Sequence, residues 1–321
     1  MSANDAPLVT TILPSYNHAR YVEEAVRSVW AQDYPNHKLV AIDDGSTDGS
    51  ADILGRLGAE SPIPMEVILK QNEGLSRTLN LGIEVAEGDY LNVCPSDDRF
   101  LPNKLRVLVD ALELADREVA VAFGDRRGID EEGDPFPYSP VRFDPMDGSR
   151  FFLDVIMGRV IMPAPAMLYR RSMFEELGGF NEHVMMEDWD IWLRVTNRLK
   201  MMFVPDVVVE YRCHPDQTHI VKVSRISADR LASFEKWVGE APDLEDRKTL
   251  RATRAHLYHQ VGVDFFRGGY KANAVRWLAK SISAQPLRIN TWRMLFRSLP
   301  GGEESFQLAR NAKNRFKGRA R

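Results

Sequence analysis

The stretch that decides the fold is residues 8–44, LVTTILPSYNHARYVEEAVRSVWAQDYPNHKLVAIDD. The apolar run LVTTILP at residues 8–14 is typical of a buried strand, and KLVAIDD at residues 38–44 is typical of a second one. Between them, residues 21–31 place apolar side chains at helical spacing. A strand, a helix and another strand in this order indicate two parallel strands joined by a helical crossover.

Strand-like and helix-like segments keep alternating along the first 125 residues. Further strands are expected at residues 65–70, 89–95 and 119–125, and further helices at residues 45–59, 74–88 and 103–116. Residues 201–214, MMFVPDVVVEYRCH, are expected to form a strand, a turn and a strand. This rhythm predicts an α/β fold with a doubly wound, mostly parallel sheet that helices cover on both faces.

The pattern becomes purely helical beyond residue 220. We therefore predict an α/β domain at residues 1–219 and an all-helical C-terminal region at residues 220–321. Within that region, residues 265–286, FFRGGYKANAVRWLAKSISAQP, are similar to one tetratricopeptide-type hairpin. One such unit is not an array, so the region is expected to be a helical extension of the α/β domain.

The formal net charge of −4 is unevenly distributed. Residues 220–321 carry 21 Lys and Arg against 9 Asp and Glu, a net charge of +12, which leaves −16 for residues 1–219. This asymmetry favours an anionic partner for the C-terminal region, such as an anionic membrane surface. A solvated helical surface would have the same composition, so both interpretations stay open.

Cysteine content and hydropathy indicate the compartment. Two cysteines, Cys94 and Cys213, are too few for a disulfide framework and favour a reducing environment. The N-terminal residues lack the basic and apolar regions of a signal peptide. No apolar run reaches the length of about 18 residues that a membrane-spanning helix needs. We therefore expect a cytoplasmic protein.

Polar residues follow each of the first four predicted strands. They are PSYN at residues 14–17, DDGS at 43–46, NEG at 72–74 and SDD at 96–98. In doubly wound sheets, ligands bind beyond the carboxyl ends of the strands. Because the four loops deliver carboxylates, amides and an aromatic ring to one edge of the sheet, we expect the binding site there.

Two of these loops contain adjacent carboxylates. Asp97 and Asp98 offer the oxygen ligands that Mg²⁺ or Mn²⁺ prefers, although an aspartate before a helix also serves in turns and caps. Asp43 and Asp44 can accept hydrogen bonds from a nucleobase or a ribose, although turn chemistry alone would explain the same residues.

A third acidic group opens a helix further along the chain. Residues 185–195, MMEDWDIWLRV, place three acids within four positions, flanked by methionines and tryptophans. Helix capping accounts for one acid at a helix start. A carboxylate beside aromatic surface can instead serve as a general base, while the aromatic rings stack on a sugar.

Four segments together resemble the inverting glycosyltransferases of family 2, of the non-processive "ED" type. They are residues 12–50, 72–98, 170–195 and 211–217, the last reading YRCHPDQ. The resemblance covers residues 7–220 and implies the GT-A fold for the α/β domain. It does not extend over the helical C-terminal region.

The resemblance implies a donor pocket built from the strand-end loops. Tyr16 would lie close to the base, Asp44 would accept from a uracil-type imide, and Asp97 would contact the ribose or the donor sugar. Asn80 also falls where the family lines this pocket. The donor-binding residues implied in this way are Pro14, Ser15, Tyr16, Asn17, Asp43, Asp44, Asn72, Arg77 and Asp97.

Metal and catalytic residues are implied by the same motifs. SDD stands at the family's DxD position, so Asp98 would hold Mn²⁺ or Mg²⁺ on the diphosphate. His214 would complete the metal shell, with His219 as the alternative. Asp188 of the "ED" motif would be the general base, with Glu187 and Trp189 on the acceptor side.

The resemblance implies metal-dependent, inverting sugar transfer. Transfer of a single sugar is expected because the QxxRW signature of processive synthases is missing. The donor would be a nucleotide-diphosphate sugar, with UDP as the expected nucleotide. The acceptor would be a glycan or a lipid-linked oligosaccharide in cell-surface polysaccharide biosynthesis, at the inner face of the membrane. No nucleic acid partner is expected, and the oligomeric state stays open.

Two alternatives remain at this point. A nucleotidyltransferase of similar fold would need a Gly-, Arg- or Lys-rich phosphate loop where residues 14–17 stand. A catalytically silent scaffold would bind a partner through its helical C-terminal region, but the acids that catalysis requires are all present in this chain.

Overall fold

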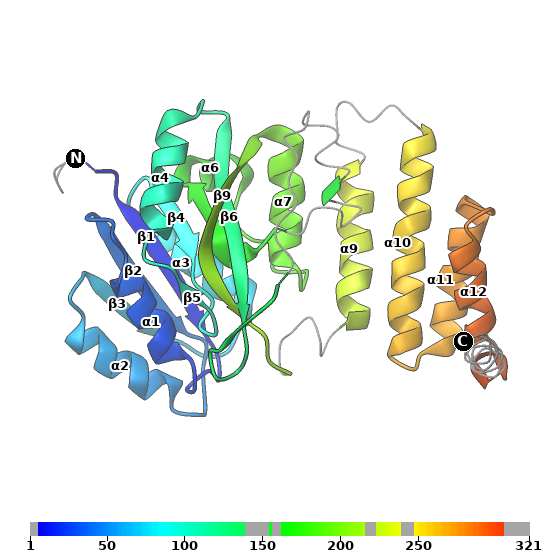
Figure 1. Ribbon diagram of the computed structural model, residues 1–321, viewed down its shortest axis with the longest axis horizontal. Coiled ribbons are helices and arrows are strands. Elements are labelled where there is room, and N and C mark those ends of the chain that lie inside the picture. The colour runs from blue at the N-terminus through cyan, green and yellow to red at the C-terminus, as the bar shows by residue number, and fades with distance from the viewer. Residues whose placement is uncertain (1–5, 139–153, 156–161, 216–222, 239–246, 305–321) are drawn as a thin grey trace, which may run out of the picture. The chain divides into compact units, whose positions relative to one another are not determined.

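The computed structural model describes residues 6–138, 154–155, 162–215, 223–238 and 247–304 (Figure 1). The chain divides into two compact units, Met1–Pro215 and Asp216–Arg321. The boundary expected at residue 219 falls among residues outside the described part, so it stays a prediction. Among the described residues, no helix combines the length and the apolar character that crossing a membrane requires.

The first half of the sheet in Met1–Pro215 is parallel, with strand order β3-β2-β1-β4. Ser15 at the end of β1 lies opposite Asp43 at the end of β2, so the polar loops leave the sheet at the same edge. The elements are β1 (Val9–Ser15), α1 (Val22–Trp30), β2 (His37–Asp43), α2 (Ser50–Glu60), β3 (Met65–Leu69), α3 (Leu75–Val85) and β4 (Tyr90–Val93).

The second half of the sheet is mixed, and its order is β8-β6-β9-β5. β8 runs antiparallel to both β4 and β6, whereas β9 runs parallel to β6. The elements are β5 (Arg99–Phe100), α4 (Lys104–Leu114), β6 (Val119–Ile129), β7 (Pro135–Phe136), β8 (Met167–Arg170), α6 (Arg171–Leu177), α7 (Glu187–Arg198) and β9 (Lys200–Arg212). The predicted α/β class is confirmed, with antiparallel strands joining after the fourth strand.

β9 is one strand and not the strand, turn and strand expected from its sequence. Its pairing with β6 shifts register between Phe123 and Asp125, where the partner changes from Phe203 to Val207. The shift accommodates Pro205, which cannot donate to a ladder, without ending the strand.

Helices cover both faces of the sheet, as the alternation predicts (Figure 1). α1, α2 and α4 pack on one face, where their apolar stripes share a single buried cluster with β1 and β2. In α1, for example, Val22, Ala25, Val26 and Val29 are buried while Glu23 faces solvent. α3 packs on the other face, where Gly82 lies against Ile12 of β1.

Asp216–Arg321 is helical in its described part, as predicted. Successive helices pack against one another, and α10 and α11 form a hairpin in which Gly262 lies close to Leu278. Membership of this hairpin among tetratricopeptide repeats stays a prediction. The helices are α9 (Val223–Val238), α10 (Arg247–Arg267), α11 (Lys271–Ala284) and α12 (Ile289–Ser298).

Gly82→Ala tests the close approach of α3 to the sheet. A methyl group on Gly82 would collide with Cγ2 of Ile12, so we expect a loss of about 1–3 kcal/mol in the free energy of unfolding. Gly55 in α2 is the matched control, because a methyl group there meets nothing. Gly55→Ala is expected to stabilise the protein by up to about 1 kcal/mol through helix propensity. Urea denaturation measures both, and equal effects would contradict the packing described.

Candidate active site

Two histidines and an aspartate meet beyond the ends of three strands. His18 follows β1, Asp97 follows β4 and His214 follows β9. Nε2 of His214 lies 3.1 Å from Oδ2 of Asp97, and the potential ligand atoms of all three residues lie within 4.8 Å of one another. Two imidazoles and one carboxylate can hold a divalent cation, and the imidazoles favour Mn²⁺ over Mg²⁺.

His18 was missed by the motif-based prediction, although it lies in the first polar loop. Its Nδ1 is 2.7 Å from Oγ of Ser96, and its backbone N–H donates to Oγ of Ser50 at 3.0 Å. Fixing one ring nitrogen in this way orients the other for a metal ion. The sequence signal that could have identified His18 is its position: a histidine, which can bind metal, follows the first predicted strand by four residues.

Asp97 and Asp98 point to different partners. Burial disfavours the charge of Asp97, but the hydrogen bond with His214 and the electrostatic influence of His18 more than offset this, so the pKa of Asp97 is lowered. Asp98 is buried, and its Oδ1 accepts the backbone N–H of Arg212 at 2.8 Å. Burial, together with the charge of Asp97, raises the pKa of Asp98 well above its ordinary value.

The metal-ligand group found in the described residues therefore contains Asp97 and not Asp98. Sequence reasoning gave the metal to Asp98 and the sugar or ribose to Asp97. In the structure, Asp97 lies beside His214, while Oδ1 of Asp98 accepts the backbone N–H of Arg212 in β9. The predicted roles of the two carboxylates stay predictions. His214 joins the group as predicted by the YRCH motif, whereas His219 lies outside the described residues.

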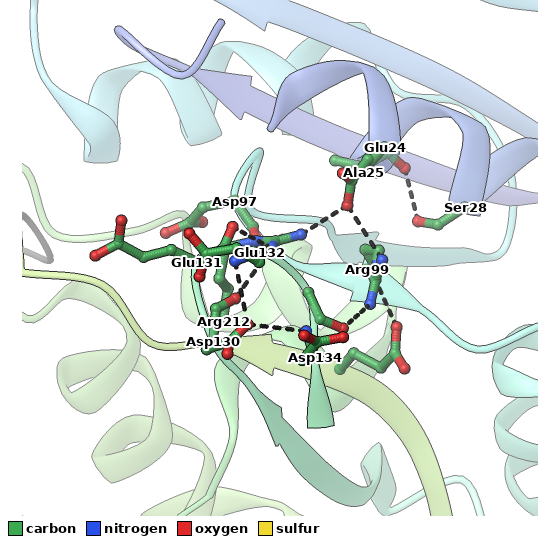
Figure 2. Close-up of polar contacts among 12 residues, drawn as sticks. Glu24, Ala25, Ser28, Asp97, Arg99, Asp130, Glu131, Glu132, Asp134 and Arg212 are labelled. Atoms are coloured by element: carbon green, nitrogen blue, oxygen red, sulfur yellow. Dashed lines mark hydrogen bonds and ion pairs between the residues drawn. The ribbon is translucent and has the colours of Figure 1, made fainter. Parts of the chain in front are cut away.

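Arg212 connects the surroundings of this group (Figure 2). Its guanidinium is buried and donates to the backbone carbonyl of Asp97 at 2.9 Å and to those of Asp130 and Glu131 at 3.1 and 3.0 Å. A carboxylate oxygen of Glu24 in α1 lies 2.7 Å from Nη2. One side chain thus fixes the SDD loop, the loop after β6 and α1 relative to β9.

The second acidic pair is saturated by protein groups. Asp43 accepts the N–H and the hydroxyl of Ser46, at 2.8 and 2.6 Å. Asp44 accepts Nζ of Lys70 at 2.5 Å and the N–H groups of Glu73 and Gly74, both at 2.9 Å. Both residues shape the loops after β2 and β3 in this structure, and their predicted contacts with the nucleoside stay predictions.

The first loop presents an exposed aromatic ring. Pro14 and Ser15 are buried at the end of β1, whereas Tyr16 is 48% exposed. Asn17 adopts a positive φ of 54° and accepts the N–H of Thr47 at 2.8 Å, which joins this loop to the loop after β2. Oγ of Ser15 has no hydrogen-bond partner within the described part of the chain, so it remains available to a ligand.

Two of the predicted donor residues on α3 hold the loop after α6 instead. Nε of Arg77 donates to Glu182 at 3.0 Å, and Asn80 exchanges hydrogen bonds with the backbone of Phe180 at 2.7 and 3.0 Å. Asn72 is exposed in the loop before α3. Asn80 is therefore a structural connection, while Arg77 and Asn72 retain exposed polar groups near the strand ends.

Glu187 and Asp188 open α7 as an adjacent pair. Burial first, and the charge of Asp188 second, raise the pKa of Glu187 to about 8. Oδ1 of Asp188 accepts the backbone N–H of Trp189 at 2.6 Å. Trp189 itself is only 4% exposed, so its ring packs in the interior and is not offered to an acceptor sugar as the sequence suggested.

Relatives with similar sequences are described as glycosyltransferases. A protein of Rickettsia conorii, described as an uncharacterised glycosyltransferase, is 29% identical over 212 residues, which is 65% of this chain. This chain spans 35% of that relative's length. A Bacillus subtilis protein named as a teichuronic acid biosynthesis glycosyltransferase, TuaG, is 33% identical over 132 residues, 41% of this chain and 52% of its own.

Solved structures share the fold at low identity. Residues 1–349 of TarS from S. aureus, in complex with UDP-GlcNAc, align with a TM-score of 0.66 and 18% identity over 94% of this chain and 92% of that one. Mannosyltransferase PcManGT from Pyrobaculum calidifontis, in complex with GDP-Man and Mn²⁺, aligns with a TM-score of 0.60 and 20% identity over 88% of this chain and 77% of that one. Both likenesses support the GT-A fold.

The family model described as "Glycosyl transferase family 2" matches residues 10–178. This segment runs from β1 to α6, so it includes His18, the SDD loop and the loops after β1, β2 and β3. It is more than half of the 321 residues. The chain belongs to glycosyl transferase family 2.

Proposed function

We propose that this chain is a metal-dependent, inverting glycosyltransferase that moves one sugar from a UDP-sugar to a hydroxyl group of a glycan or lipid-linked oligosaccharide. The group of His18, Asp97 and His214 carries this proposal, because a diphosphate donor needs a cation at the strand ends where these residues meet. The complexes of TarS with UDP-GlcNAc and of PcManGT with GDP-Man and Mn²⁺ support it. The name of TuaG supports a role in cell-surface polysaccharide biosynthesis.

Asp97, His18 and His214 would hold the cation, which offsets the charge that develops on the departing nucleotide diphosphate. The hydrogen bond between Nδ1 of His18 and Oγ of Ser96, and the one from Arg212 to the carbonyl of Asp97, would orient this group before the donor arrives. Tyr16 and the free hydroxyl of Ser15 lie in the loop where the nucleoside would bind.

Asp188 would take the proton of the acceptor hydroxyl while its oxygen attacks the anomeric carbon. Burial and the charge of Asp188 raise the pKa of Glu187 to about 8, so Glu187 is largely protonated at neutral pH and is less suited than Asp188 to accept a proton. One displacement from the opposite face of the sugar inverts its configuration.

Asp97→Asn is expected to weaken the Mn²⁺-dependent binding of UDP by more than about tenfold, because it removes a charged ligand. Asp98→Asn is the matched control, since the carbonyl of asparagine can still accept the N–H of Arg212. Calorimetric titration with UDP, with and without Mn²⁺, measures both. If Asp98→Asn loses the metal dependence and Asp97→Asn keeps it, Asp98 is the metal ligand after all. If Mn²⁺ has no effect on the wild-type protein, the proposed metal dependence is wrong.

Asp188→Asn is expected to lower sugar transfer by about 10²–10⁴-fold while UDP binding is kept, because only the proton acceptor is lost. Glu187→Gln resembles the protonated acid and is expected to retain most of the transfer.

Because the pKa of Glu187 rises from 4.5 to about 8 on folding, the free energy of unfolding falls as the pH rises through that range. The melting temperature of Glu187→Gln should therefore exceed that of the wild type more at high pH than at low pH. Wild-type transfer rates in Asp188→Asn would rule out this base.

We propose further that Asp216–Arg321 rests on an anionic membrane at the cytoplasmic face. Five large apolar side chains on and beside α12 are between 42% and 95% exposed: Leu287, Ile289, Trp292, Phe296 and Leu299. Four of them recur at spacings of three and four, which gives α12 one apolar face. The helix also carries Arg293 and Arg297 and no acid. Apolar and basic residues in this pattern are typical of helices that lie in a membrane surface.

Trp292→Ser with Phe296→Ser is expected to reduce binding to vesicles of phosphatidylcholine and phosphatidylglycerol by about tenfold or more, because both rings leave the lipid. Leu114→Ser is the control, since Leu114 is also exposed, at 91%, but lies on α4. Co-sedimentation measures binding, and light scattering detects self-association. Unchanged binding in the double variant, or a dimer that it dissolves, would reject the membrane contact.

A further inference from the structure

Arg126 in β6 is a buried cation with an unused hydrogen-bonding group. The residue is 8% exposed, and its Nη1 reaches no hydrogen-bond partner among the described residues. No ion pair involves Arg126 within that part of the chain either. A buried guanidinium in this condition is costly unless a ligand completes it.

Other buried arginines of the same unit are satisfied by protein groups. Arg212 donates to three backbone carbonyls and pairs with Glu24. Arg194 donates to the carbonyls of Leu177 and Gly179 and pairs with Asp190. Nε of Arg194 also lacks a hydrogen-bond partner in the described part of the chain, but it lies 3.1 Å from Oδ2 of Asp190, so both of these guanidiniums have a carboxylate counter-ion. Arg126 differs from them because an aromatic ring lies against its guanidinium where the other two have carbonyl and carboxylate acceptors.

An aromatic cluster orients the guanidinium. Its Cζ lies 4.6 Å from the centre of the Tyr138 ring, and the ring of Tyr138 packs at 6.0 Å from that of Tyr211. Gly128 makes room for this arrangement, because a methyl group there would collide with Phe136 and Tyr138. Stacking on a ring fixes the plane of a guanidinium and leaves the N–H groups in that plane able to bind a ligand.

Arg126 lies in the part of β6 that pairs with the last residues of β9. Arg126 lies opposite Val209 in β9, on the row that Gly128 and Tyr211 continue toward the end of the strand. Cys213 follows there, and burial, followed by the charge of Asp98, raises the pKa of its thiol while Arg126 acts in the opposite direction. Arg126 and the SDD loop thus both lie within electrostatic reach of Cys213, the residue before His214.

We propose that Arg126 binds a phosphate group of a substrate. Arginine presents two parallel N–H donors to phosphate oxygens, and such contacts are strongest where water is excluded. The identity of the phosphate rests on the proposed function: it is either the diphosphate of the donor or a phosphate of a lipid-linked acceptor. Binding of the anion itself does not depend on sugar transfer.

Arg126→Gln tests the anion site directly. In thermal melts without metal, we expect inorganic pyrophosphate to raise the melting temperature of the wild type by several degrees. At the same concentration, the increase for Arg126→Gln should be at least ten times smaller. Without ligand, Arg126→Gln should melt at the same temperature as the wild type or higher, because an uncompensated buried charge is removed.

Arg127→Gln is the matched control. Arg127 is the next residue of β6, its side chain is 52% exposed, and it pairs with Glu210. Its replacement should leave the response to pyrophosphate intact. Two results would overturn the proposal: a ligand-free Arg126→Gln protein that melts several degrees below the wild type, which marks a structural arginine, or an undiminished response to pyrophosphate.

The source of the phosphate follows from two titrations with Mn²⁺ present. A donor contact predicts that Arg126→Gln weakens the binding of UDP at least tenfold and that of UMP much less. An acceptor contact predicts unchanged UDP binding and a raised KM for a polyprenyl-diphosphate-linked sugar, and no change in either quantity would reject a substrate role. Failure of the wild type to use any nucleotide sugar would refute the proposed function but not the binding of pyrophosphate.

Discussion

The loops around the candidate active site depend on the hydrogen bonds of the buried Arg212 guanidinium. Four oxygens surround it, from the backbones of Asp97, Asp130 and Glu131 and from the side chain of Glu24. Its backbone N–H adds a fifth attachment through Asp98. Because this cation is buried, losing any partner would leave a charge unsatisfied, so the surrounding loops are held in one arrangement. That arrangement brings His18 and His214 to Asp97.

Adjacent acids occur in the SDD loop and at the start of α7, and in both places one of the two has a raised pKa. In the SDD loop, the pKa of Asp97 is lowered and that of Asp98 is raised. At the start of α7, Glu187 has a raised pKa beside Asp188. Burial with a like charge nearby favours one proton per pair. In each of these two pairs, one carboxyl group has a raised pKa.

Much of the fold and part of the site could be predicted from the sequence. Alternating periodicities located the parallel strands and their polar loops, because both patterns are local. β8 and the single long β9 were not foreseen, since strand direction and register depend on distant partners. The different partners of Asp97 and Asp98 were also out of reach. Asp98 accepts a backbone amide 114 residues further along the chain, and no local pattern records that contact. His18 escaped because a lone histidine in a loop has no periodicity.

The separation of His18 and His214 in the sequence has a consequence for biosynthesis. The loops after β1, β2 and β4 can assemble once about the first hundred residues have left the ribosome, but β9 ends only at Arg212. Until then, β5 has no partner strand and one edge of β6 is open. The nascent chain thus has a sheet with an unprotected edge and an incomplete ligand group. β9 covers that edge of β6, and His214 follows β9 by two residues, so all three ligand-type residues are present only once Met1–Pro215 is almost fully synthesised.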